Sequence, residues 1–468
     1  MLFNSLHFAA FLPCVVLLYY LIPYRFRYLM LLVASYYFYM SWKMEYIVLI
    51  MGSTVIDYFA AKKIAGATLK EIRRRWLVLS LLSNLGILFG FKYFNFFSDS
   101  ARQMFEAFDL SIHVPYFDVL LPVGISFYTF QTLSYTIDVY RGKTQPEKHF
   151  GIFALYVSFF PQLVAGPIER STHLLPQFRQ KVVFSYENFR IGLWLMALGF
   201  YKKLVIADRV AIYVNEIYAD PQSAGGMQII LATFFFAFQI YCDFSGYSDI
   251  AIGSARLMGY DLMENFKRPY FARSLSDFWR RWHVSLSSWF KDYLYIPLGG
   301  NRKGYLRLNI NLMIVFLVSG LWHGANWTFV LWGGIHGSWL VLENFMSRAI
   351  GPKIKLPRLV SIFITFSITC LGWIFFRADN VGDAFILIRN IFQPSGGLSF
   401  AEFTLFDICL SLALIGLLEL YHIFEEKDRF YVLNASWFVR WPAYIGVALL
   451  ISWFGKFFEP SEFIYFQF

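Results

Sequence analysis

Long apolar runs separated by short polar or basic connections dominate this chain. Runs long enough to cross about 30 Å of hydrocarbon lie at 5–23, 27–42, 45–61, 76–97, 117–138, 151–166, 187–207, 226–246, 306–325, 327–346, 358–377, 404–424 and 437–456. The pattern predicts an all-α polytopic membrane protein with about 11–13 transmembrane helices. Glycine, proline or charge interrupts several runs, which indicates re-entrant or broken helices buried by protein or lining water.

The domain organisation follows from the same pattern. We find no internal repeat and no soluble domain, so we expect a single integral membrane domain over 1–468. A loop at 393–402, rich in proline, serine and glycine, predicts a division into a core, 1–390, and a C-terminal helical pair, 391–468.

Composition supports the membrane class. Charged residues make up 15% of the 468 residues, well below the roughly 25% of soluble domains. The net charge is +10, but the basic residues lie mostly between apolar runs. There they set orientation and contact lipid headgroups, so we expect membrane lipids as partners and no nucleic acid. The four cysteines stand apart in apolar stretches and form no ligand cluster, so we expect no metal site.

Charges in short loops predict the orientation. The connection 62–75 carries Lys62, Lys63, Lys70, Arg73, Arg74 and Arg75 against one acidic residue, and should be cytoplasmic. Counting back places the N-terminus outside, in the periplasm if the membrane is a bacterial inner membrane. No basic region or cleavage site accompanies the first run, which we expect to be a retained span.

The segment 319–327, SGLWHGANW, is the strongest candidate for chemistry. His323 lies in a strongly apolar run, where an ionisable side chain is expensive and indicates a function. Ser319 and Asn326 lie about one turn away and could hydrogen-bond the ring. The alternative is a structural histidine satisfied by a neighbouring helix. Gly320 and Gly324 have the spacing of close helix packing.

A second candidate histidine, His283, lies in the segment 275–295, where charged and aromatic residues alternate. The pattern predicts an amphipathic helix at an interface or folded back into the protein. Asp277 and Arg281 can pair along it, and Ser287 shares a face with His283. The alternative is an anchor helix with an incidental histidine. His336 would not share a face with His323 on one straight helix, and we interpret it as structural.

Two further segments carry intramembrane polar groups. Asp243, in QIYCDFSGYSD at 239–249, could orient a histidine or pair with an arginine. The run 121–141 carries a stripe of hydroxyl and amide side chains. We expect that stripe to hold helices together, with a tunnel wall as the alternative.

Together these segments resemble the membrane-bound O-acyltransferase family, in its AlgI/DltB branch. The motifs are PVGISFYTFQ (122–131), YCDFSGYSDIAIG (241–253), FWRRWHVSLSSWFKDYLYIPLGG (278–300), GLWHGANW (320–327) and WIFFRA (373–378). The opening MLFNSLHF and the run 31–42 are similar to alginate O-acetylation members. The resemblance covers nearly the whole chain.

The resemblance implies a ring of helices around a central funnel closed by re-entrant helices. It implies transfer of an acetyl group from cytoplasmic acetyl-CoA, a substrate rather than a bound cofactor, towards an exported polysaccharide. A periplasmic SGNH-type acetyltransferase and the polysaccharide secretion machinery would be partners. The family's two key histidines map onto His323 and His283. We assign substrate contacts to Arg280, Arg281, Trp282, Ser287, Asn326 and Asp243.

These residues predict a mechanism and leave alternatives open. His323 would act as general base in acyl transfer from a thioester to a hydroxyl, or carry the acyl group itself. Arg280 and Arg281 could meet coenzyme A phosphates or lipid headgroups. The alternatives are D-alanyl transfer from a carrier protein to teichoic acid, a proton-coupled transporter, and a non-catalytic assembly subunit.

Overall fold

The computed structural model describes residues 1–110, 115–117, 121–164, 166–350, 356–394, 397–400, 402–426, 428, 430–457 and 463–464. Within these residues the regular structure is helical, with a single isolated bridge between Phe400 and Phe403. The predicted all-α class is confirmed.

Seven helical stretches of the described chain are long and apolar enough to cross a membrane: Met44–Gly66, Lys70–Glu106, Gly226–Leu257, Tyr305–His323, Arg358–Arg377, Leu405–Glu425 and Trp437–Phe454. Leu6–Leu21 is apolar but shorter. Some other apolar runs form interrupted helices. The run 151–166, for example, becomes two short helices that meet at Phe159. The protein is therefore a multi-pass membrane protein with broken helices among its spans.

Internal contacts divide the chain into two compact units. The first contains Met1–Ser185 and Ala255–Met263, and the second contains Tyr186–Ser254 and Glu264–Phe468. The expected separation of 391–468 from a core at 1–390 stays a prediction.

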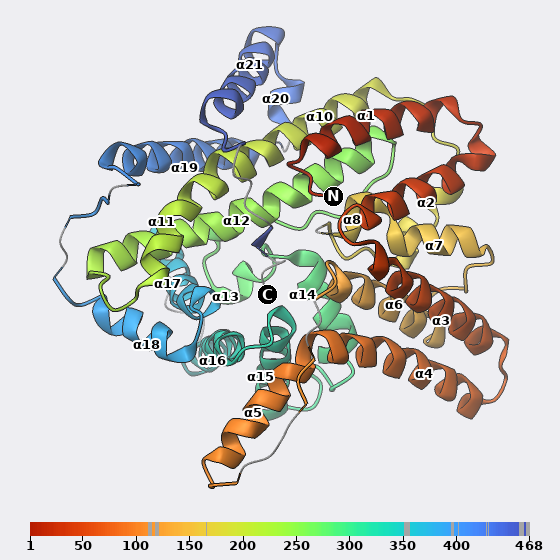
Figure 1. The fold of residues 1–468 in the computed structure, drawn as a ribbon, viewed down its shortest axis with the longest axis horizontal. Helices are drawn as coiled ribbons and strands as arrows, with labels where there is room; N and C mark the ends of the chain where they lie inside the picture. The colour runs from red at the N-terminus through yellow and green to blue at the C-terminus, as the bar shows by residue number, and fades with distance from the viewer. Residues whose placement is uncertain are drawn as a thin grey trace. The chain divides into compact units, whose positions relative to one another are not determined.

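In the first unit α3, α4 and α6 pack against one another, and α2 packs against α7 (Figure 1). Its helices are α1 (Leu6–Leu21), α2 (Tyr24–Met40), α3 (Ile47–Gly66), α4 (Lys70–Leu88), α5 (Phe94–Glu106), α6 (Ile125–Tyr140), α7 (Phe150–Ser158), α8 (Phe160–Leu163) and α9 (Ser171–Leu174). A π-helical turn, Phe89–Tyr93, joins α4 to α5.

Buried polar contacts connect these helices. The carboxylate of Asp57 on α3 is fully buried and accepts hydrogen bonds from Ser80, from Asn84 Nδ2 at 2.9 Å and from Thr136 Oγ1 at 3.2 Å. Gln131 Nε2 on α6 donates to the carbonyl of Tyr156 on α7 at 2.6 Å. The prediction that polar residues of α6 hold helices together is confirmed at Gln131, because its amide bonds a neighbouring helix.

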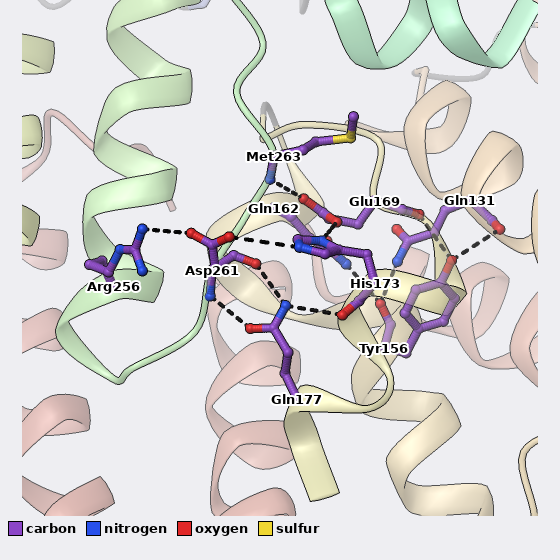
Figure 2. Close-up of polar contacts among 9 residues, drawn as sticks. All are labelled: Gln131, Tyr156, Gln162, Glu169, His173, Gln177, Arg256, Asp261 and Met263. Carbon is purple, nitrogen blue, oxygen red and sulfur yellow. Dashed lines mark hydrogen bonds and ion pairs between the residues drawn. The ribbon is translucent and has the colours of Figure 1, made fainter. Parts of the chain in front are cut away.

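A second polar network ties the connection after α12 to α9 (Figure 2). Glu169 is fully buried and its carboxylate contacts the backbone N–H of Met263 at 2.5 Å and His173 Nδ1 at 2.7 Å. The other ring nitrogen of His173 faces Asp261 at 3.7 Å, and Asp261 pairs with Arg256 at 2.6 Å. The segment Ala255–Met263 is thereby held by side-chain contacts along its length.

The second unit contains the longest helices. They are α10 (Tyr186–Phe200), α11 (Asp208–Ala219), α12 (Gly226–Leu257), α13 (Leu275–Phe278), α14 (Val284–Phe290), α15 (Tyr305–His323), α16 (Trp327–Ile350), α17 (Arg358–Arg377), α18 (Val381–Asn390), α19 (Leu405–Glu425), α20 (Tyr431–Asn434) and α21 (Trp437–Phe454). A π-helical turn, Tyr201–Ala207, joins α10 to α11. Glycines bring α10 and α12 together, since a Cβ on Gly199 would lie 2.6 Å from the carbonyl oxygen of Gly246.

Candidate active site

The candidate site is built on the antiparallel pair α15 and α16, which lie side by side in the second unit (Figure 1). Glycines make this contact close: a Cβ on Gly333 of α16 would lie 2.2 Å from the carbonyl oxygen of Phe316, and one on Gly320 of α15 would lie 2.2 Å from that of Phe329. Small residues allow such approach in membrane proteins. The predicted role of Gly320 in close packing is confirmed.

His323 is the last residue of α15, and its side chain is 3% exposed. Aromatic rings surround it edge-on, with the ring centroid of Trp332 at 5.0 Å and that of Phe376 at 5.4 Å. The next residue is Gly324, and no side chain fits at this position because a Cβ would lie 2.1 Å from the ring of Phe329. The helix end and the packed rings fix the position of the imidazole.

His283 precedes α14 and has a left-handed backbone conformation, φ +42°. Such a conformation costs about 1–3 kcal/mol and occurs often at functional sites. Asn265 holds it there, because its carbonyl accepts from Val284 N at 2.9 Å and its side chain accepts from Ser285 Oγ at 2.9 Å. The imidazole is fully buried, and its ring centroid lies 4.6 Å from that of Phe244. Burial lowers the pKa of His283 to about 3, so the ring is neutral at physiological pH.

Trp322 connects the two candidate histidines. Its ring centroid lies 5.0 Å from that of His323 and 6.2 Å from that of His283. Residues forty positions apart in the sequence therefore meet around one indole. His336 lies on α16 rather than on the helix of His323. It is fully buried, and its ring centroid lies 4.9 Å from that of Trp332.

A cavity of about 520 Å³ is lined by residues of α14 and α15, the elements next to His283 and ending at His323, although neither histidine lines the cavity itself. Its wall includes Val284 and Ser287, next to His283, and Ser319, one turn before His323. Arg280 and Lys291 also line the cavity, and both side chains are exposed to solvent. Leu286, Phe290 and Ser319 are buried. The cavity thus combines an exposed cationic part with a buried part that is largely apolar.

The structure brings some predicted substrate contacts to the cavity and places others elsewhere. Arg280 and Ser287 line it, whereas Arg281, Trp282, Asn326 and Asp243 are absent from its wall. Arg281 pairs with Asp277 at 2.9 Å, as the spacing predicts. Trp282 is buried among aromatic rings, stacked at 5.5 Å on Phe278.

Asn326 and Asp243 have identifiable partners of their own. Asn326 accepts from the N–H of Thr328 at 3.0 Å in the first turn of α16 and donates to the carbonyl of Asp379 at 2.9 Å. Asp243 contacts Lys203 Nζ at 2.6 Å and accepts from the N–H of Ile464 at 2.8 Å. The expectation of an arginine partner for Asp243 is wrong, since Asp243 pairs with a lysine from the π-helical turn after α10.

The segment 275–295 differs from its predicted form. It is not one amphipathic helix but α13, a turn, α14 and a π-helical turn, Lys291–Tyr295. Glu343 of α16 explains the position of α13, because it accepts from the N–H groups of Leu275 at 2.7 Å and Ser276 at 3.2 Å. The charged residues of this segment therefore reach the cavity from short elements rather than from a continuous face.

Several residues of the site gave weak signals in the sequence. Asn265 and Lys203 are polar residues outside the recognised histidine motifs, and their roles depend on distant partners. Trp279 and Phe316 line the cavity, but aromatic residues are so frequent in this chain that their type alone marks nothing. Among the described residues no group of histidine, cysteine, aspartate and glutamate could hold a metal ion.

Comparisons with known proteins agree on one family. The family model described as MBOAT, membrane-bound O-acyltransferase family, matches residues 148–378. A probable alginate O-acetylase, AlgI, of Pseudomonas aeruginosa is 41% identical over 384 residues, which cover 82% of this chain and 73% of that protein.

Two other relatives widen the range of named activities. The peptidoglycan O-acetyltransferase of Helicobacter pylori is 37% identical over 429 residues, covering 85% of this chain and 80% of its own length. The teichoic acid D-alanyltransferase of Bacillus subtilis is more distant, 24% identical over 280 residues, covering 56% of this chain and 70% of its own length. The chain therefore belongs to the membrane-bound O-acyltransferase family and is a multi-pass membrane O-acyltransferase.

Proposed function

We propose that this protein transfers an acetyl group from cytoplasmic acetyl-CoA for O-acetylation of an exported polysaccharide in a bacterial inner membrane. The observation that carries the proposal is the cavity at α14 and α15, which has exposed cations at Arg280 and Lys291 and a buried part that includes Ser319, one turn before His323. The names of the relatives with 37–41% identity, alginate O-acetylase and peptidoglycan O-acetyltransferase, support acetyl as the acyl group.

In this proposal the donor's phosphates lie against Arg280 and Lys291, which can bind them through charge-assisted hydrogen bonds. The uncharged thioester arm extends past apolar side chains such as Phe290 and Val315. Its carbonyl then lies near the turn of α15 that carries Ser319 and His323. The apolar wall excludes water and favours transfer to the acceptor over hydrolysis.

His323 is the proposed general base. It accepts the proton of the acceptor hydroxyl while that oxygen attacks the thioester carbonyl, and the thiolate of coenzyme A leaves. A positioned base contributes about 10²–10⁴-fold to the rate. His283 is the proposed second catalytic histidine. It is neutral by burial, so it acts through hydrogen bonding rather than as a fixed cation. A periplasmic SGNH-type acetyltransferase would carry the acetyl group to the polymer.

The experiment measures acetyl release from labelled acetyl-CoA by the purified protein, comparing wild type with His323→Gln. We expect the variant to lose turnover by about 10²–10⁴-fold at an unchanged melting temperature. His336→Gln is the matched control, because His336 is also a buried imidazole against Trp332 and has no proposed chemical role. Undiminished turnover in a folded His323→Gln protein would refute the proposed base.

The donor assignment has its own readout. Arg280→Ala should raise KM for acetyl-CoA about tenfold with little change in kcat, the loss expected for one charge-assisted hydrogen bond. An unchanged KM would favour a headgroup contact for Arg280. Turnover with a D-alanyl carrier protein and none with acetyl-CoA would instead favour D-alanyl transfer, and the distant teichoic acid relative makes that the second candidate.

A further inference from the structure

A narrow apolar cavity lies on the second unit, apart from the candidate active site. Its volume is about 280 Å³, and it is formed by α10, α19 and α21 with the short α20. It runs from Leu417 to Phe424 on α19 and from Ala443 to Leu450 on α21. Seven residues of helix correspond to about 10 Å, so the cavity is an elongated slot. We call it the acyl slot. An extended hydrocarbon chain is the ligand that such a slot fits best.

A polar cavity of about 200 Å³ continues from the acyl slot. The two cavities share Leu198 on α10 and Tyr421 on α19. Lys202, four residues after Leu198, and Glu425, four residues after Tyr421, both line the polar cavity. An apolar wall and a charged wall therefore adjoin at Leu198 and Tyr421. That arrangement matches an amphiphile whose apolar part lies in the acyl slot and whose polar part lies in the polar cavity.

The charges of the polar cavity are balanced. Lys202, Lys267 and Arg268 line it together with Asp249, Glu264 and Glu425. Lys202 Nζ is 2.7 Å from Asp249, and Arg268 is 3.3 Å from Glu426. An anionic headgroup would match only the basic side chains. A headgroup with a phosphate and a primary ammonium matches both signs, because the ammonium can donate hydrogen bonds to carboxylates.

We propose that this is a specific phospholipid site, with one acyl chain in the acyl slot and a phosphoethanolamine headgroup in the polar cavity. The site is separate from the transfer reaction and does not depend on the proposed function. Arg268 and Lys267 would bind the phosphate, and Glu425 would accept from the ammonium.

The test measures lipid bound to the purified full-length protein by native mass spectrometry. The protein is equilibrated with an equal mixture of phosphatidylethanolamine, phosphatidylglycerol and phosphatidylcholine. We expect one retained phosphatidylethanolamine. Gly446→Leu should lower its occupancy about tenfold, since Gly446 lines the acyl slot and a Cβ there meets nothing within 4 Å, a loss equivalent to about 1.4 kcal/mol.

Gly416→Leu is the matched control for the acyl slot, because Gly416 lies on α19, also has no atom within 4 Å of a Cβ and does not line the slot. Glu425→Gln should remove the preference for phosphatidylethanolamine over phosphatidylglycerol. Arg268→Ala should lower the occupancy of both lipids. Arg102→Ala removes an exposed ion pair on α5 and should change neither the lipid preference nor the occupancy.

Two results would overturn the proposal. Equal retention of the three lipids by the wild-type protein would show general contact with the bilayer and no specific site. Unchanged phosphatidylethanolamine occupancy in a folded Gly446→Leu protein would show that no acyl chain occupies the slot.

Discussion

The close contact between α15 and α16 gives the sharpest mutational test of how the site is positioned. Gly333→Ala would place a Cβ 2.2 Å from the carbonyl oxygen of Phe316 and 3.4 Å from the Cα of Gly320. Close carbon–oxygen contacts between helices are about 3.3 Å, so the two helices must separate by about 1 Å. Backbone atoms form this contact, and no side chain can rotate away to relieve it.

The expected cost follows from that displacement. Overpacking of this kind destabilises by about 1–3 kcal/mol. A misplacement of about 1 Å can lower a rate about 10²-fold, and the displaced helix carries both Phe316 in the cavity wall and His323 at its end. We therefore expect Gly333→Ala to lower both the melting temperature and the rate of acyl transfer.

The neighbouring glycine provides the control. A Cβ on Gly334 would meet only Leu317 Cδ2, at 3.8 Å, which is ordinary contact. Gly334→Ala should keep full activity and gain about 0.5–1 kcal/mol, because alanine favours helix more than glycine does. The assay is acetyl release together with a thermal melt for each variant. Wild-type activity and stability in Gly333→Ala would refute the argument that this contact sets the position of His323.

Two other predictions concern the first unit. Asp57→Ala should lower the free energy of unfolding by about 1–3 kcal/mol, since it leaves buried donors such as Asn84 Nδ2 without an acceptor. The Thr54 hydroxyl bonds the carbonyl of Ile50 on its own helix, so Thr54→Ala should lower the melting temperature less. The hydrogen bond to Glu169 raises the pKa of His173 above its ordinary 6.5, so the imidazolium stabilises the fold fully below about pH 6.5 and this contribution is lost as pH rises through the raised pKa. The effect should be about 0.2–1 kcal/mol after solvent screening, and a His173→Gln protein whose melting temperature shows the same pH dependence as wild type would contradict it.

The sequence predicted the fold class because that feature depends on local composition, and it marked His323 and His283 as candidates whose catalytic roles stay predictions. Apolar runs report membrane helices directly, and a histidine in such a run is rare enough to be conspicuous. Gly320 was also predictable, because small residues at helical spacing have few other uses in a membrane span.

The positions of other residues depend on distant partners and were not predictable. Nothing in the spacing of 275–295 shows that Glu343 binds its start and Asn265 its middle, where the segment forms short helices. The same limit applies to Asp243, whose partner Lys203 comes from a π-helical turn forty residues earlier. Trp282 stands beside His283 in the sequence, but its indole packs into an aromatic cluster and stacks on Phe278.

The pairing of Asp243 bears on the electrostatics of the site. A carboxylate beside an imidazole raises its pKa, and Asp243 is adjacent in sequence to Phe244, whose ring packs against His283. Because Asp243 instead contacts Lys203 and the N–H of Ile464, burial governs His283 and its pKa is lowered to about 3. The imidazole then offers one acceptor and one donor but no positive charge. In the proposed function, an anionic donor would therefore find its counter-charges at Arg280 and Lys291 in the exposed part of the cavity. The histidines would then serve, in the same proposed function, the uncharged thioester and the acceptor hydroxyl.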